Sequence, residues 1–171
     1  MADVTLVEGR LSFEFVGVDF AEKYDEWRHY RNKFNSACGS SKAVDFIVSK
    51  DNELWLIEVK DFRRNRRTKP IDLADEIALK VRDTMAGLVS TKFVGANPGE
   101  VTASASALSK GKLRVALHLE QPRNPSRLFP ISVNPANIKM KLRQNLKFAD
   151  AHPVVVDLAG FPAHLGRVVS I

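Results

Sequence analysis

The feature that most constrains the fold is a predicted β-hairpin in the first third of the chain. Its strands are residues 42–48 and 54–60, which are rich in β-branched and aromatic side chains. The dipeptide Asp51-Asn52 between them suits a two-residue turn that needs positive φ. Both faces of this hairpin are mainly apolar, and strands of that kind belong inside a covered sheet.

The turn fixes which residues of the two strands face each other. If Lys50 pairs with Glu53, then Asp45 on the first strand stands directly opposite Glu58 on the second. Lys60 lies on the same face as Glu58, because strand side chains alternate with a period of two. The hairpin therefore predicts two adjacent carboxylates with an ammonium group beside them.

Such a pair of carboxylates needs something to offset its repulsion. At a separation of ~5 Å and an effective dielectric constant of ~20, two like charges repel by about 3 kcal/mol. A bound divalent cation between Asp45 and Glu58 is the natural remedy. The alternative that stays open is a plain ion cluster on a solvated strand, which needs no function.

The arrangement of these residues resembles the signature of the PD-(D/E)XK nuclease superfamily. Asp45, twelve intervening residues and then Glu58-Val59-Lys60 match its motif, within a similarity that covers mainly residues 19–90. The sequence departs from the pattern at Val44, where the family name has proline. The resemblance implies an α/β, restriction-endonuclease-like fold, in which a mixed central sheet is flanked by helices. It also implies a metal-dependent nuclease and favours DNA as the substrate, while nothing in the residues excludes RNA.

The resemblance assigns roles to these residues. Asp45 and Glu58 would hold Mg²⁺, for which Mn²⁺ can substitute, together with the backbone carbonyl of Val59. Lys60 would position a metal-bound water or neutralise developing charge, so that Asp45, Glu58 and Lys60 are the expected catalytic residues. A further carboxylate from the preceding helix would complete the metal shell; Glu22 and Glu26 are the candidates on one face, and we favour Glu26.

The remaining pattern predicts one α/β domain over residues 1–171. Helical spacing of apolar residues predicts helices over 19–36 and 71–88 and another that starts at Asn134. Alternation predicts strands over 113–120 and 153–158, while the glycines and small residues of 94–111 indicate a loop. The apolar tail that follows should dock on the rest of the chain.

The charge of the chain favours a polyanionic partner. The formal net charge is +6, and neutralising phosphates with counterion release drives binding to nucleic acid. A basic loop follows the second hairpin strand directly and is the predicted nucleic-acid-binding segment. Its cations are Arg63, Arg64, Arg66, Arg67 and Lys69.

The cysteine content and the hydropathy indicate the cellular location, whereas the oligomeric state and two other functions stay open. The single Cys38 cannot form an intramolecular disulfide, and no long apolar run is present, so we expect a cytoplasmic protein without a membrane anchor. A homodimer would let two sites cut both strands of a duplex. Two other hypotheses are a catalytically silent nucleic-acid-binding module of the same fold, and an accessory subunit with a structural ion cluster.

Overall fold

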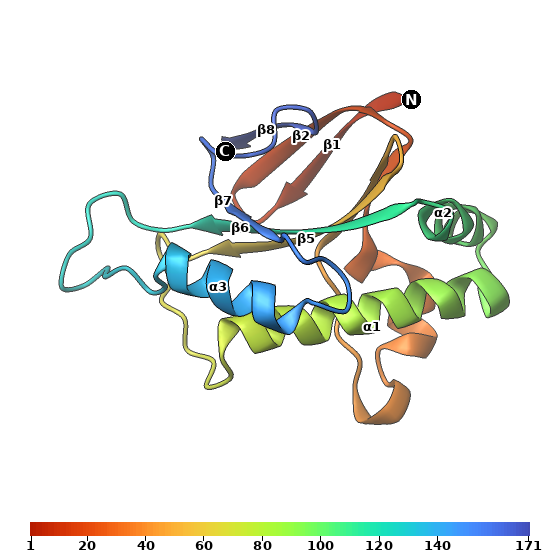
Figure 1. Ribbon diagram of the computed structural model, residues 1–171, viewed down its shortest axis with the longest axis horizontal. Helices are drawn as coiled ribbons and strands as arrows, with labels where there is room; N and C mark the ends of the chain where they lie inside the picture. The colour runs from red at the N-terminus through yellow and green to blue at the C-terminus, as the bar shows by residue number, and fades with distance from the viewer.

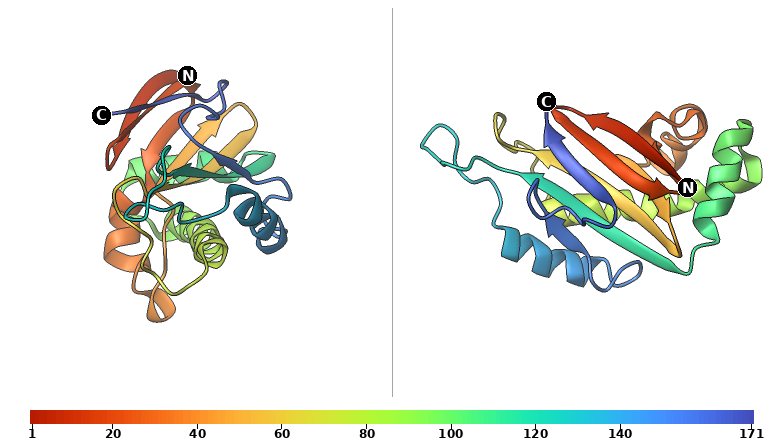
Figure 2. Two further views of the ribbon diagram at one scale, coloured as in Figure 1. Left: turned by 90° about the vertical axis from the view of Figure 1, so that its left-hand side faces the viewer. Right: turned by 90° about the horizontal axis from the view of Figure 1, so that it is seen from above.

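The computed structural model describes all of residues 1–171 and arranges them in three layers (Figure 1). A three-stranded sheet lies over a five-stranded sheet, and helices cover the other side of the five-stranded sheet. The two views of Figure 2 show the same order. The amino-terminal strands lie on one side of the large sheet, and helices α1 and α3 lie on the other. The five-stranded sheet is thus covered on both faces.

The strands divide between the two sheets as follows. The small sheet has the order β1-β2-β8 and consists of β1 (Ala2–Glu8), β2 (Leu11–Val18) and β8 (Gly166–Ser170). The large sheet has the order β3-β4-β5-β6-β7 and consists of β3 (Phe20–Lys23), β4 (Phe46–Lys50), β5 (Glu53–Asp61), β6 (Lys112–Glu120) and β7 (Val154–Val156). The helices are α1 (Leu73–Val94), α2 (Pro98–Leu108) and α3 (Pro135–Asn145), with short turns of helix over Tyr24–Glu26, Tyr30–Phe34 and Ala37–Gly39.

The predicted hairpin is confirmed as β4 and β5 with the predicted register, but the first strand begins at Phe46, so residues 42–45 lie before it and Asp45 is outside the paired ladder. Lys50 pairs with Glu53 and Phe46 with Ile57, and Asp51 has the positive φ of 51° that the turn was expected to need. The large sheet is mixed, because β3, β4 and β5 are antiparallel whereas β5, β6 and β7 are parallel. This confirms the predicted α/β class with a mixed sheet.

Each face of the large sheet has its own hydrophobic core. On the helix side, strand residues such as Ile47 and Leu56 pack with Ile77 of α1. On the other side, Phe46 packs against Phe13 of β2, with ring centroids 4.9 Å apart in an edge-on arrangement. Side chains of alternating strand positions thus go to opposite cores, which is why the hairpin is apolar on both faces.

The prediction of a helix over residues 19–36 is wrong at its start. Phe20–Lys23 form β3, which pairs with β4 and places Ala21 in the core between the sheets. The segment turns only at Tyr24, whose backbone N–H donates to the carbonyl of Asp45. Pairing with an otherwise open strand edge therefore overrides the helical spacing of the aromatic residues.

The prediction of a loop over residues 94–111 is also wrong, because Pro98–Leu108 form α2. The side chain of Asn97 accepts hydrogen bonds from the N–H groups of Gly99 and Glu100, and Pro98 occupies the first turn. Asparagine followed by proline is a typical helix start. Ala103 and Ala107 are small enough to let α2 pack closely on the large core.

The other predicted elements are confirmed. The helix predicted over 71–88 is α1, which runs to Val94, and α3 begins after an Asn134 cap. The predicted strands are β6 and β7, and the apolar tail docks as β8 against β2. No helix combines the length and the apolar composition needed to cross a bilayer.

Candidate functional site

The predicted carboxylate pair lies on the helix side of the large sheet, under α1. Glu58 and Lys60 belong to β5, and Asp45 immediately precedes β4. The segment before β4 is tied to α1, since the N–H of Val44 donates to Thr84 Oγ1 at 3.1 Å. The sheet and the helix therefore hold the three predicted residues in one place.

Glu58 is fully buried and forms the centre of the cluster. Its Oε1 accepts a hydrogen bond of 2.6 Å from the ammonium group of Lys80 and forms an ion pair of 2.6 Å with that of Lys60. Its Oε2 is buried and has no hydrogen-bond partner. A buried carboxylate of this kind is stable only because two cations converge on it.

Asp45 faces the same ammonium group from the other strand. Its Oδ1 lies 3.9 Å from Lys80 Nζ, and its Oδ2 accepts a hydrogen bond of 2.6 Å from the N–H of Val59. Burial, and then the neighbouring charge of Glu58, raise the pKa of Asp45 to about 7. Asp45 is consequently the group of this cluster that titrates near neutral pH.

A third carboxylate, which sequence reasoning missed, comes from α1. Glu76 is fully buried, and its oxygens lie 3.5 Å from Lys60, 2.8 Å from Lys69 and 2.9 Å from Arg67. Burial opposes its ionisation, but Lys69, Lys60 and Arg67 outweigh burial and hold the pKa at about 2. The available signal was its position one helical turn before Lys80, which puts both on the face of α1 that meets the sheet.

These contacts change the explanation of how the carboxylates coexist. The ammonium groups of Lys80 and Lys60 supply the positive charge that we expected from a divalent cation. No group of three or more His, Cys, Asp and Glu side chains converges as a metal-ligand set. Glu58 Oε2 is the carboxylate oxygen of this cluster that has neither a hydrogen bond nor an ion pair, and a cation between the carboxylates would have to displace Lys80. Mg²⁺ at this position stays a prediction.

Glu26 and Val59 relate to this cluster differently. Glu26 lies apart from it, in an ion pair with Lys23, which also binds Glu8 of β1. Glu22, on the same segment, accepts a hydrogen bond from the indole of Trp27. The structure thus does not bring Glu26 to Asp45 and Glu58, because residues 20–23 form a strand in place of the expected helix. Val59 does join the cluster, through its N–H.

Most of the cations in the basic loop after β5 are paired with acceptors within the molecule. Arg63 forms a bidentate pair with Asp61, and Arg66 donates to the backbone carbonyls of residues 127 and 128. Arg67 and Lys69 bind Glu76, which leaves Arg64 as the exposed cation without an ion pair or side-chain hydrogen bond. Nucleic-acid binding by this loop stays a prediction, while the contacts assign four of its five cations a structural role.

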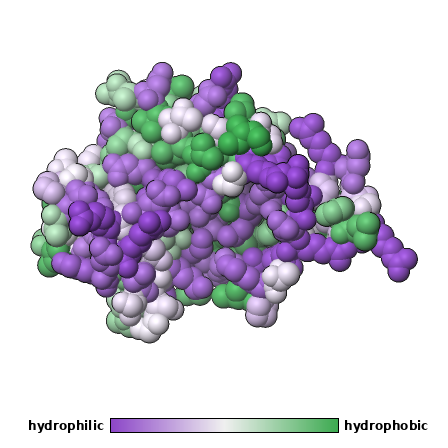
Figure 3. All heavy atoms as spheres, turned by 180° about the vertical axis from the view of Figure 1, so that it is seen from behind, coloured by the Kyte–Doolittle hydropathy of each residue, from purple (hydrophilic) through white to green (hydrophobic).

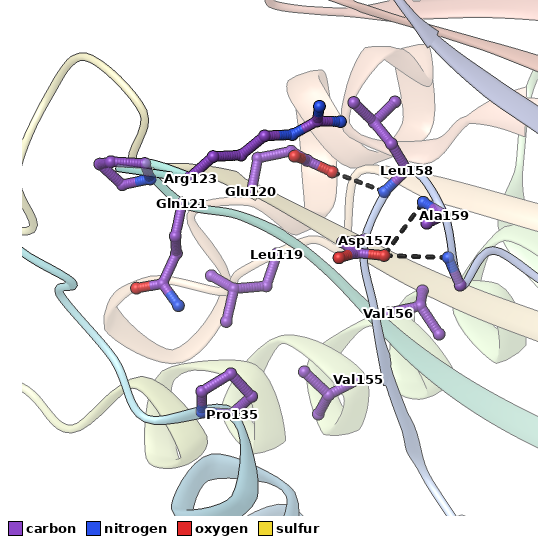
Figure 4. Close-up of a pocket in the computed structure, with 12 residues that line it drawn as sticks. Leu119, Glu120, Gln121, Arg123, Pro135, Val155, Val156, Asp157, Leu158 and Ala159 are labelled. Atoms are coloured by element: carbon purple, nitrogen blue, oxygen red, sulfur yellow. Dashed lines mark hydrogen bonds between the residues drawn. The ribbon is translucent and has the colours of Figure 1, made fainter. Parts of the chain in front are cut away.

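A second concave region opens at the carboxyl ends of β6 and β7 (Figure 4). It has a volume of about 450 Å³, and its acidic groups are bonded to the turn that follows β7. Glu120 accepts from the N–H of Leu158, and Asp157 accepts from the N–H groups of Ala159 and Gly160. His118 is buried, and its Nε2 lies 3.0 Å from Oε1 of Glu120.

The surface is mostly hydrophilic on the face seen in Figure 3. Hydrophobic side chains gather there near the small sheet and on the projecting arm formed by the segment after β6. The exposed apolar residues of that arm are Leu128, Phe129 and Ile131.

Comparison with known proteins finds similarity to a tRNA ligase. The chain is 34% identical, over an alignment of 192 positions, to a cysteine--tRNA ligase of Neisseria meningitidis serogroup A / serotype 4A (strain DSM 15465 / Z2491). The alignment includes 91% of this chain, which spans only 27% of the length of that relative. No family model matches the chain, and no solved structure matches it.

This comparison corrects the functional assignment made from the hairpin motif. The similarity extends over nearly the whole chain and is to a ligase, whereas the resemblance to PD-(D/E)XK nucleases depended on three residues and their spacing. The assignment as a Mg²⁺-dependent DNA nuclease is therefore wrong, and the silent or accessory relative of such a nuclease has no support either. The fold is established as α/β with a mixed sheet, and not as restriction-endonuclease-like.

Proposed function

We propose that this chain has a role in charging tRNA with cysteine, and that its own part is to bind the tRNA. The observation that carries the proposal is the 34% identity to a cysteine--tRNA ligase over 91% of the chain. Because the chain spans about a quarter of that relative, we assign it one task within the reaction and not the whole activity.

The charge of the chain supports tRNA as the molecule it binds. Of the participants in tRNA charging, tRNA is the large polyanion, and a net charge of +6 favours association with it through release of counterions. We predicted DNA as the substrate only because of the nuclease resemblance, so the correction of that resemblance also removes the reason for preferring DNA. We place the protein in the cytoplasm on the same basis, since tRNA is charged where proteins are made.

The ion cluster under α1 has a supporting part in this proposal. Glu76 anchors Arg67 and Lys69, and Arg66 anchors the arm after β6 through two backbone carbonyls. The cluster thus fixes the positions of two exposed segments relative to the sheet. Its contribution to tRNA binding would be to keep the loop after β5 and the arm after β6 in fixed positions.

The proposal is tested by titrating the chain against three labelled probes in an electrophoretic mobility assay at 0.15 M salt. The probes are tRNA for cysteine, tRNA for another amino acid, and duplex DNA with the same number of phosphates. We expect both tRNAs to bind more tightly than the DNA, with an affinity that falls as salt rises. Equal affinity for the three probes, or tighter binding of the DNA, would overturn the proposal.

A further inference from the structure

Most of the net positive charge of the chain comes from one short region, residues 134–149. This region, which is α3 with its two ends, has four basic residues and no acidic residue. The other 22 basic and 20 acidic residues leave the rest of the chain at only +2. The electrostatic attraction of a polyanion should therefore be strongest near α3.

Three of the four cations of this region are free to meet a ligand. Lys141 is paired with Asp72, whereas Lys139, Arg143 and Lys147 are exposed and take part in no ion pair or hydrogen bond. The cations of the loop after β5 differ in this respect, since four of the five have partners within the molecule.

The free cations form a short row. Lys139 and Arg143 are four residues apart in α3 and lie on one face of the helix, and Lys147 follows in the turn after the helix ends at Asn145. At a rise of about 1.5 Å per residue, Lys139 and Arg143 stand roughly 6 Å apart along the axis. That separation is comparable with the distance between adjacent phosphates of one nucleic-acid strand.

The helix that carries this row is firmly held. Ile138, Leu142 and Leu146 are buried in the large core, and the Asn134 side chain caps the first turn by accepting from two backbone N–H groups. Figure 2 shows α3 at the outside of the helical layer, beside α1. Its cations are thus presented from a rigid element, which reduces the ordering entropy that binding must overcome.

Apolar groups stand next to the row and suit the non-phosphate parts of a nucleotide. Met140 is 57% exposed and Phe148 is 54% exposed. A surface depression of about 620 Å³ runs along the helix and is lined by Lys139, Met140, Arg143 and Lys147. An aromatic ring beside a phosphate-binding row can stack on an unpaired base.

We infer that the exposed face of α3 and the turn after it bind the sugar-phosphate backbone of tRNA, with Lys139, Arg143 and Lys147 on its phosphates. This inference rests on the proposed function and adds the surface that performs it. Because phosphate contacts position a nucleic acid without reading its sequence, α3 should contribute equally to every tRNA. Discrimination among tRNAs must come from other parts of the molecule.

The test compares two triple variants that remove the same charge. One is Lys139→Gln, Arg143→Gln, Lys147→Gln, and the matched control is Lys33→Gln, Lys92→Gln, Lys112→Gln, whose lysines are exposed and lie elsewhere. Affinity for tRNA for cysteine and for a second tRNA is measured at several salt concentrations. Far-ultraviolet circular dichroism verifies that both variants are folded.

We expect the α3 variant to lose roughly tenfold or more in affinity at 0.15 M salt and its logarithmic salt slope to fall by about 2.7. The control should stay within about twofold of the unmodified chain, and the ratio of affinities for the two tRNAs should not change in either variant. Lys141→Gln, at the paired cation, should have a smaller effect than Arg143→Gln.

Two results would overturn the inference while the proposed function stands. One is wild-type binding of tRNA by the α3 variant, and the other is an equal loss in both triple variants, which would mean a general effect of charge. If the unmodified chain shows no preference for tRNA over DNA, the proposed function itself fails, and the inference fails with it.

Discussion

Lys80 of α1 donates a hydrogen bond of 2.6 Å to Glu58 of β5, and the same ammonium lies 3.9 Å from Asp45. One lysine thus joins a helix to β5 and to the residue that immediately precedes β4. The repulsion that two opposed carboxylates would suffer is offset from within the chain, with Lys60 as the second cation. The cluster is therefore a part of the fold before any ligand is considered.

Removal of the Lys80 charge should destabilise the protein strongly. In Lys80→Met, buried Glu58 keeps only Lys60, and loss of one partner from a buried ion pair costs roughly 3–5 kcal/mol. The free energy of unfolding from urea titration at pH 7 measures the effect. Arg82→Gln is the control on the same helix, because Arg82 is mostly exposed and its loss should change stability by only about 0.5 kcal/mol.

A double variant separates an ion pair from simple packing. If Lys80 acts through charge, then Lys80→Met combined with Glu58→Gln should cost clearly less than the two single changes together. Additive losses would show that the pair is not coupled.

The raised pKa of Asp45 predicts a dependence of stability on pH. Burial, and then Glu58, keep Asp45 protonated in the folded protein up to about pH 7, whereas its ordinary pKa is 3.8. Between these values the folded state binds more protons, so stability falls as pH rises, by at most about 1.4 kcal/mol per pH unit from this group. Urea titrations of the wild type and Asp45→Asn from pH 4 to 8 measure it.

The comparison of the two proteins isolates Asp45 from other titrating groups. We expect Asp45→Asn to resemble the wild type near pH 4 and to become the more stable of the two as pH approaches 8. A difference that is constant across this range would mean that Asp45 does not titrate there.

The prediction of a magnesium site has a specific consequence at Lys80. If Asp45 and Glu58 bind Mg²⁺, the ion competes with the Lys80 ammonium, and Lys80→Met should bind it roughly tenfold more tightly, a gain of about 1.4 kcal/mol. Isothermal titration of both proteins with MgCl₂ measures this, with Lys80→Met, Glu58→Gln as the control. If the heat of binding is identical in all three proteins, Mg²⁺ does not bind at this site.

Gly87 of α1 should not tolerate a side chain, although alanine is the better helix former. A Cβ at this position would lie 1.9 Å from the hydroxyl of Tyr24, which is buried against the helix. The propensity gain of about 1 kcal/mol is outweighed by an overpacking cost of roughly 1–3 kcal/mol. We therefore expect Gly87→Ala to lower the melting temperature, and Tyr24→Phe in the same chain to restore part of the loss.

The sequence was most informative where a periodic pattern and the final packing agree. The hairpin register followed from one turn, and α1 and β6 from apolar positions at helical and strand spacing. Residues 20–23 were misassigned because their partner strand is distant in sequence, and α2 because its small residues were taken for loop residues. Such errors arise from tertiary contacts that local patterns do not report.

The candidate site was predictable only in part. Asp45, Glu58 and Lys60 do meet, since they share one hairpin, but Glu76 reaches them from a helix whose rotation no spacing rule fixes. The basic loop looked like the binding segment because its charge is dense, yet internal acceptors occupy most of it. Function was the least predictable, because a three-residue motif can occur in an ion cluster without the chemistry.

The most direct test of the account is a competition measurement at 0.15 M salt. Labelled tRNA for cysteine is bound to the chain and displaced, in separate titrations, by the same unlabelled tRNA and by duplex DNA with an equal number of phosphates. The account predicts that displacement by DNA needs at least about a tenfold higher concentration, which is about 1.4 kcal/mol of preference for tRNA. Displacement by DNA at the same or a lower concentration would contradict it.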